Sequence, residues 1–161
     1  MVTIYHASDK IVSKIKNPEK EKIGYRKDFG YGFYCTRIKK QAERWNELKY
    51  DNRGVVNTFL YDEERALKNV KIKYFKEDDE WLEFIVLNRS KDIKPEFDII
   101  EGPMADDKIF NYIQSYMDEE ISKDDFWEKV RFNKLTNQIC FLTEKAVKFL
   151  EFKGVEKNEK R

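Results

Sequence analysis

The sequence has few of the residues that build metal centres and disulfide frameworks. Its 161 residues include one histidine and two cysteines, and no Cys/His cluster has the spacing of metal ligands. Cys35 and Cys140 both lie in apolar, strand-like segments. We therefore expect two reduced, buried thiols of a cytoplasmic protein and no bound metal.

Long apolar runs and an excess of one charge are also absent. No segment approaches the roughly 20 apolar residues of a membrane-spanning helix, and the N-terminus does not have the pattern of a signal peptide. This predicts a cytoplasmic protein with no membrane partner. Lys and Arg number 32 and Asp and Glu 31, a formal net charge of +1. That balance excludes a global attraction to nucleic acid and leaves only a local basic patch open.

The chain does contain enough apolar material for one core. Hydrophobic residues make up 40% of it and aromatic residues 15%, in a length that is ordinary for one domain. No repeat, low-complexity segment or linker divides the sequence. We expect a single domain over residues 1–155 and a charged, flexible tail over residues 156–161.

Apolar periodicity predicts an irregular alternation of strands and helices. Strands are expected at residues 2–6, 33–36, 55–61, 70–74, 97–101 and 138–142 and near 152. Helices are expected at 39–49, 80–88, 106–117, 122–130 and after 143, and a short helix or turn is expected near 11–15. Asn17-Pro18 and Gly102-Pro103 are expected to end elements. Thr36, Ser122 and Thr143 are expected to cap helices. Mostly antiparallel connections favour the α+β class over a doubly wound sheet.

The segment 28–36 and the helix after it carry the densest functional signal. Gly30 and Gly32 lack a Cβ atom, so backbone there can approach a ligand closely. Tyr34 follows on a short strand, and Trp45 lies further along, on the apolar face that Ile38, Ala42 and Leu48 define at helical spacing. Taken alone, this pattern is more typical of a hairpin turn that leads into a core strand.

Three segments together resemble the motifs of ADP-ribosyltransferases, in the branch of the poly(ADP-ribose) polymerases and diphtheria toxin. Tyr5-His6-Ala7-Ser8 resembles their His-Gly-Ser motif. Gly30-Tyr31-Gly32-Phe33-Tyr34-Cys35-Thr36 resembles Gly-x-Gly-Ile-Tyr-Phe-Ala, and Asn137-Gln138-Ile139-Cys140-Phe141 resembles Asn-Glu-Tyr-Ile-Val. The chain is most similar to a bacterial domain family of unknown function, the DUF3990 type, in its Asp-Phe-Gly-x-Gly-Phe-Tyr run, Gly-Pro-x-Ala-Asp-Asp block and late Asn-Gln pair.

The resemblance implies a fold, a ligand and a set of site residues. The fold would be the split antiparallel sheets of the transferases with flanking helices, and NAD would be the substrate. His6, Tyr34 and Gln138 would be catalytic, and NAD would also be bound by Ala7, Ser8, Gly30, Gly32, Trp45 and Asn137. Aromatic faces such as Tyr34 and Trp45 suit a planar cationic ring, and His6 would bond a ribose hydroxyl.

Two positions depart from the pattern of the transferases. Gln138 replaces their usual glutamate and is neutral, so we expect single transfer rather than polymer growth. Restoring Glu at position 138 is expected to raise NAD hydrolysis, because it returns a negative charge to the site. Ala42 stands where relatives often have a serine that bonds nicotinamide.

Three functions stay open on the sequence alone. The first is a mono-ADP-ribosyltransferase that modifies an unknown acceptor, a protein, nucleic acid or small molecule, as a bacterial toxin or phage-conflict effector with an antitoxin or inhibitor protein as partner. The second, favoured by the neutral Gln138, is a weakly active or inactive module that binds NAD or ADP-ribose. The third is an interaction domain without nucleotide. Arg26 and Asp106-Asp107 are further candidates, although a solvated loop and a helix N-terminus also explain them.

Overall fold

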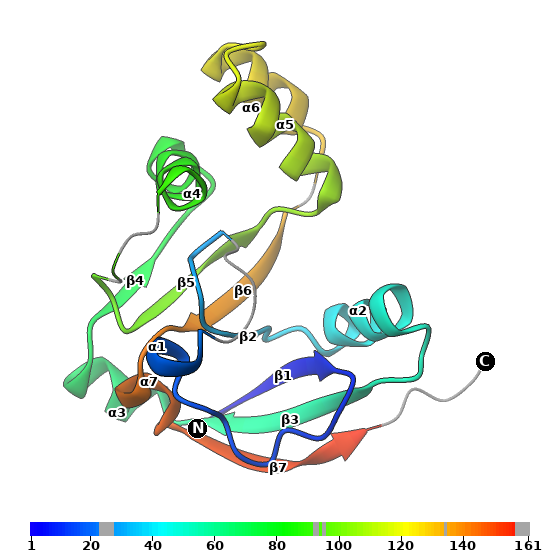
Figure 1. Ribbon diagram of the computed structural model, residues 1–161, viewed down its shortest axis with the longest axis vertical. Helices are drawn as coiled ribbons and strands as arrows, with labels where there is room; N and C mark the ends of the chain where they lie inside the picture. Colours follow the sequence, from blue (N-terminus) through cyan, green and yellow to red (C-terminus); the bar gives the residue numbers. More distant parts are fainter. Residues whose placement is uncertain (23–27, 92–93, 95, 134, 157–161) are drawn as a thin grey trace.

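The protein is built on two open β-sheets that splay apart from each other (Figure 1). The computed structural model describes residues 1–22, 28–91, 94, 96–133 and 135–156. The first sheet has the order β1-β3-β7 and consists of β1 (Val2–Ser8), β3 (Val55–Tyr61) and β7 (Leu150–Glu156). The second has the order β2-β6-β5-β4 and consists of β2 (Phe33–Cys35), β6 (Thr136–Phe141), β5 (Ile99–Met104) and β4 (Ile72–Tyr74).

Most strand pairs are antiparallel, which confirms the expected α+β class. Among the described strands, β4 and β5 form the one parallel pair. The helices are α1 (Pro18–Glu21), α2 (Lys39–Tyr50), α3 (Glu63–Asn69), α4 (Asp79–Ser90), α5 (Asp107–Met117), α6 (Lys123–Val130) and α7 (Glu144–Val147). In Figure 1, α2 flanks β1, whereas α4, α5 and α6 lie beyond the second sheet. None of the described helices is long and apolar enough to cross a membrane.

The second sheet is covered on both faces, so two hydrophobic cores share its strands. Successive side chains of a strand point to opposite faces. Ile99 and Phe141 therefore pack toward the first sheet, while Ile100 and Cys140 pack under α4, α5 and α6. This alternation determines which polar residues of β5 and β6 meet, and on which face.

Several sequence predictions hold where the local pattern is strong. The strand 55–61 has the predicted bounds. Ser122 caps α6 in a capping box with Asp125, and Thr143 caps α7. Cys35 and Cys140 are both buried and form no disulfide. The predictions of element boundaries are wrong mainly in short polar segments and at strand ends.

Residues 11–15, expected to form a short helix or turn, contain no helix. Asn17-Pro18 begins a helix instead of ending an element. Asn17 caps α1 by accepting hydrogen bonds from two backbone amides, and Pro18 suits the first helical turn because it needs no amide hydrogen there. Thr36 does not cap α2, which begins two residues after Arg37 with Ile38 as an N-cap that makes no side-chain hydrogen bond.

Two other boundaries differ from the prediction. Gly102-Pro103 does not stop β5, which runs on to Met104. β4 pairs with β5 only as far as Glu101, so Pro103 has a neighbouring strand on one side alone, where a missing amide hydrogen is tolerated. Helix α3 was not predicted from the sequence. Glu156, expected to open the tail, ends β7, and residues 157–161 lie outside the described part of the chain.

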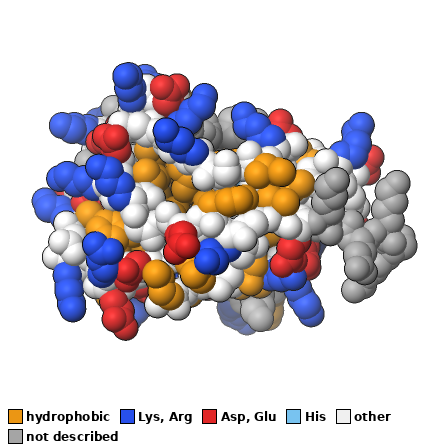
Figure 2. Space-filling view, turned by 90° about the horizontal axis from the view of Figure 1, so that it is seen from below, with side chains coloured by type: hydrophobic (Ala, Val, Ile, Leu, Met, Phe, Trp, Pro, Cys, Tyr) orange, Lys and Arg blue, Asp and Glu red, His pale blue; other side chains and the backbone are white. Residues whose placement is uncertain are grey.

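The surface mixes charges of both signs, as the balanced composition predicts. On the face seen in Figure 2, Lys and Arg side chains stand among Asp and Glu around the rim, and hydrophobic side chains gather nearer the centre. Leu48 on α2 is 73% exposed, although its helical spacing predicted an inward position with Ala42. The helix instead buries Ala42 and Asn46.

The contrast between Leu48 and Leu82 gives a matched test of this packing. Leu82 on α4 is fully buried, so Leu82→Ala should lower the free energy of unfolding by about 2–5 kcal/mol. Leu48→Ala, the same chemical change on an exposed face, should alter it by less than about 0.5 kcal/mol. Denaturant unfolding of both variants measures the difference. Equal losses would contradict the outward position of Leu48.

Candidate functional site

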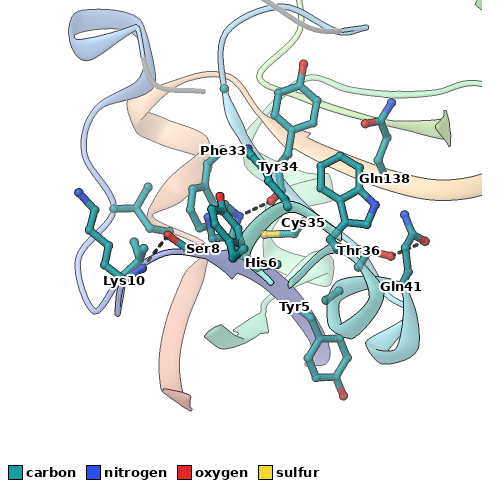
Figure 3. Close-up of a pocket in the computed structure, with 18 of the residues that line it drawn as sticks. Tyr5, His6, Ser8, Lys10, Phe33, Tyr34, Cys35, Thr36, Gln41 and Gln138 are labelled. Carbon is teal, nitrogen blue, oxygen red and sulfur yellow. Dashed lines mark hydrogen bonds between the residues drawn. The ribbon is translucent and has the colours of Figure 1, made fainter. Parts of the chain in front are cut away.

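A cavity opens where the edge strands of the two sheets meet. β1 and β2 are joined by one isolated bridge, in which Tyr5 and Thr36 exchange two backbone hydrogen bonds of 2.9 Å. Next to this bridge lies a cavity of about 430 Å³, a volume typical of small-molecule sites. Its walls come from β1, β2, α2 and β6, and include Tyr5–Ser8, Gly32–Thr36, Ala42, Trp45 and Gln138 (Figure 3).

His6 lies at this cavity with a defined ring orientation. Its Nδ1 is 2.6 Å from the backbone oxygen of Tyr34. Because a carbonyl oxygen only accepts hydrogen bonds, Nδ1 carries a hydrogen and donates it to this oxygen. The ring also packs on Phe33, with centroids 4.2 Å apart. His6 therefore links the two sheets beside the Tyr5–Thr36 bridge.

Tyr34 is held at the same wall by its hydroxyl. The hydroxyl donates to the backbone oxygen of Gly30 at 2.5 Å and accepts from the backbone amide of Phe29 at 3.2 Å. Burial raises the pKa of this phenol well above its ordinary value. Tyr34 is therefore a neutral, fixed aromatic ring and is not suited to act as a general base.

The two glycines before Tyr34 have different roles. Gly32 lines the cavity, and a Cβ atom there would come within 2.4 Å of Sγ of Cys140 and 2.9 Å of the backbone oxygen of Phe141. Gly30 is not among the lining residues. It has a φ of +97°, which L side chains rarely adopt, and its carbonyl anchors Tyr34.

Gln138 projects from β6 with its amide orientation set by two acceptors. Its Nε2 donates to Oδ2 of Asp28 at 3.1 Å and to the backbone oxygen of Pro103 at 3.3 Å. Neither partner can donate, so the nitrogen faces them and Oε1 is turned the other way. Gln138 is 5% exposed and still lines the cavity.

Asn137 takes part in a separate polar network on the opposite face of β6. Its amide donates to Glu101, which also pairs with Arg37 at 2.7 Å, and Arg37 bonds Glu63 in addition. The hydrogen bonds to Glu101 hold the pKa of the Arg37 guanidinium above its usual range. Asn137 is not among the residues that line the cavity.

Asp28 and Arg89 are site residues that sequence reasoning missed. They form an ion pair of 2.7 Å in which both side chains are largely buried, and Asp28 also accepts from Gln138. Their partners are distant in the sequence, and no local pattern links them. The one available signal was the position of Asp28 at the head of the Asp-Phe-Gly run.

A second cavity of about 820 Å³ lies on the other side of Gln138. It shares Trp45, Lys49, Met104 and Gln138 with the first and extends to Arg89 and α5. Asp106 and Asp107 line this second cavity, and Asp106 caps α5. Arg26 lies outside the described residues. Within the described ranges, no three His, Cys, Asp or Glu side chains gather as metal ligands.

Comparison with known proteins gives one family. The model of DUF3990, described as a protein of unknown function, matches residues 2–152. That range includes every residue that lines either cavity. The search of curated proteins found no match.

The Tyr34 hydroxyl gives a pH-dependent prediction. Tyr34→Phe removes two hydrogen bonds and should lower the free energy of unfolding at neutral pH by about 1–3 kcal/mol. The raised pKa means that the unfolded chain loses this phenol proton first as the pH rises above about 10. The advantage of the wild type should therefore shrink at alkaline pH. Denaturant unfolding at neutral and alkaline pH measures the difference in unfolding free energy between wild type and Tyr34→Phe. A difference that does not change with pH would contradict a buried phenol.

Proposed function

The chain belongs to the DUF3990 family of proteins of unknown function, and we propose that it is a mono-ADP-ribosyltransferase with NAD as the donor. One observation supports this most. His6, Tyr34, Trp45 and Gln138 come from β1, β2, α2 and β6 and all line one cavity. These are the positions at which the sequence resembles the transferase motifs. The two splayed sheets are likewise what the split fold of those enzymes would require.

The proposed reaction breaks the bond between nicotinamide and its ribose. The electron pair of that bond leaves with nicotinamide, which becomes neutral, while positive charge develops on the ribose C1′. A nucleophile of the acceptor then bonds to C1′, and its proton goes to solvent. The protein has to hold the ring, orient the ribose and stabilise the developing charge.

The cavity offers a group for each of these tasks. Tyr34 and Trp45 supply aromatic faces for nicotinamide, and the Ala7 backbone would bond its amide. His6 would form a hydrogen bond with a ribose hydroxyl. Oε1 of Gln138 would accept from another. Ala42 lines the cavity but has no hydroxyl for nicotinamide.

The first cavity also carries charge suited to a diphosphate. Lys10, Lys14 and Lys16 line it along the segment that follows β1. Phosphate groups are attracted by clustered ammonium groups, so the diphosphate of NAD would lie on this side, away from Trp45. Ser8, which accepts from the Lys10 amide, lies between His6 and these lysines.

The acceptor would approach Gln138 through the second cavity, because both cavities share that residue. We propose a macromolecular acceptor, protein or nucleic acid, and a role as a bacterial toxin or phage-conflict effector with an antitoxin or inhibitor protein as partner. The rival function is a module that binds NAD or ADP-ribose without transfer. The neutral side chain of Gln138 is the specific observation that favours it.

Labelled NAD separates the two functions. The purified protein is incubated with NAD labelled in the adenylate part, with and without a bacterial lysate. Transfer of label to lysate macromolecules, with release of nicotinamide, is expected. Binding of NAD by calorimetry without label transfer or nicotinamide release would favour the binding module. Absence of both NAD binding and NAD turnover would exclude the transferase and the binding module alike.

The aromatic pair gives a quantitative prediction. Tyr34→Ala should weaken NAD binding by about 1–3 kcal/mol, the scale of a base stacked on an aromatic side chain. Trp45→Ala should weaken it similarly. Tyr74→Ala is the matched control, because Tyr74 is exposed on β4 and lines neither cavity. Calorimetric titration of folded variants measures the effect. Unchanged affinity in Tyr34→Ala would remove Tyr34 from the site.

A further inference from the structure

The side chain of Gln138, which lines the first cavity, donates a hydrogen bond to the carboxylate of Asp28, which lines the second. We infer that Asp28 is a positioning residue that orients the Gln138 amide and gives its oxygen part of the negative character of a carboxylate. This inference rests on the proposed function and concerns the same site. It explains how a neutral glutamine would serve where the transferase pattern has a glutamate.

The Asp28 carboxylate is fully engaged and almost inaccessible. Oδ2 accepts from Nε2 of Gln138 at 3.1 Å and from the backbone amide of Ala105 at 3.3 Å. Oδ1 accepts from Nη2 of Arg89 at 2.7 Å. Asp28 is 4% exposed. A buried charge is costly unless it is paired, and here the cationic partner and two further donors compensate it.

The first consequence is orientation. With Nε2 held by Asp28 and Pro103, rotation of the amide by half a turn would direct Oε1 at two acceptors. In Figure 3 the amide oxygen of Gln138 is turned toward the side on which Tyr34 lies, and the nitrogen away from it. The group offered to a ribose hydroxyl is therefore always an acceptor.

The second consequence is charge. A hydrogen bond from an amide to a carboxylate is stronger than one between neutral groups, and it polarises the amide so that Oε1 becomes more negative. The carboxylate itself is one side chain away from the developing positive charge. Gln138 and Asp28 together thus contain one carboxylate, as a glutamate would, and this carboxylate is also paired with Arg89.

This pairing changes the expected effect of Gln138→Glu. Two carboxylates at hydrogen-bond distance cannot both ionise easily, so the pair would keep one proton at neutral pH. The net charge of the pair would then be the same as in the wild type. Gln138→Glu should therefore not raise NAD turnover at neutral pH, and its turnover should rise only at higher pH.

The decisive experiment exchanges the two groups. Asp28→Asn removes the charge and should lower kcat for NAD turnover by roughly tenfold to a hundredfold, with little change in KM. Asp28→Asn combined with Gln138→Glu restores one carboxylate and should recover most of kcat. Both variants lack the ion pair between Asp28 and Arg89, and the double variant also loses the hydrogen bond from Gln138 to the backbone oxygen of Pro103, so a recovery of kcat would occur despite a further structural loss. Thermal unfolding is followed for each.

The alternative is that Asp28 only fastens its segment to α4 through Arg89. In that case the double variant should be as impaired as Asp28→Asn, and the inference is overturned. An Asp28→Asn protein that is folded and keeps the wild-type kcat overturns it too. If wild-type protein neither binds nor turns over NAD, the proposed function fails and this inference falls with it, which is a distinguishable result.

The pH profile of Gln138→Glu keeps the inference testable if Asp28→Asn does not fold. The other ionisable groups that line the two cavities, which include His6, Tyr34, Lys49, Arg89, Asp106 and Asp107, are common to wild type and variant. The ratio of NAD turnover in Gln138→Glu to that in wild type, measured across the pH range, therefore reports on the carboxylate pair. A ratio that rises with pH supports the inference. A variant faster than wild type at neutral pH, with a constant ratio, contradicts it.

Discussion

The isolated bridge between Tyr5 and Thr36 is the constraint on which the arrangement of the site depends. It joins the edge strands of two different sheets at one point, and the hydrophobic core between the sheets closes the space on one side of it. On the other side the strands are free to diverge, and the first cavity opens there. His6 and Tyr34 lie next to the bridge, so their mutual position follows from the sheet geometry and not from a loop.

The alternation of side chains along β5 and β6 sorts the polar residues at the end of the second sheet into two networks. Asn137 and Glu101 point to the face of the first sheet and meet Arg37, while Gln138 points to the opposite face and meets Asp28. Adjacent residues of one motif therefore have unrelated surroundings. One network ties the segment after β2 to β5 and α3, and the other joins residues of the two cavities.

Local features of the sequence predicted local features of the structure. The alternation in residues 55–61 and the Ser122 cap depend on near neighbours, and both predictions are confirmed. The motif residues His6, Tyr34, Trp45 and Gln138 line one cavity, whereas Gly30 and Asn137 do not. Asp28 could not be connected to Gln138 beforehand, because 110 residues separate them and only the folded sheets bring them together. The prediction that Leu48 is buried fails for a related reason, because helical spacing does not reveal which part of a helix face other elements cover.

The wall shared by the two cavities has a consequence for how the protein can change over evolutionary time. Trp45, Lys49, Met104 and Gln138 each shape both spaces, so a substitution at any of them alters two pockets at once. Residues that border one cavity alone, such as Ile15 in the first or Gln114 in the second, can vary without that double effect. We therefore expect relatives with this architecture to diverge most at residues that line one cavity and least at the residues that line both.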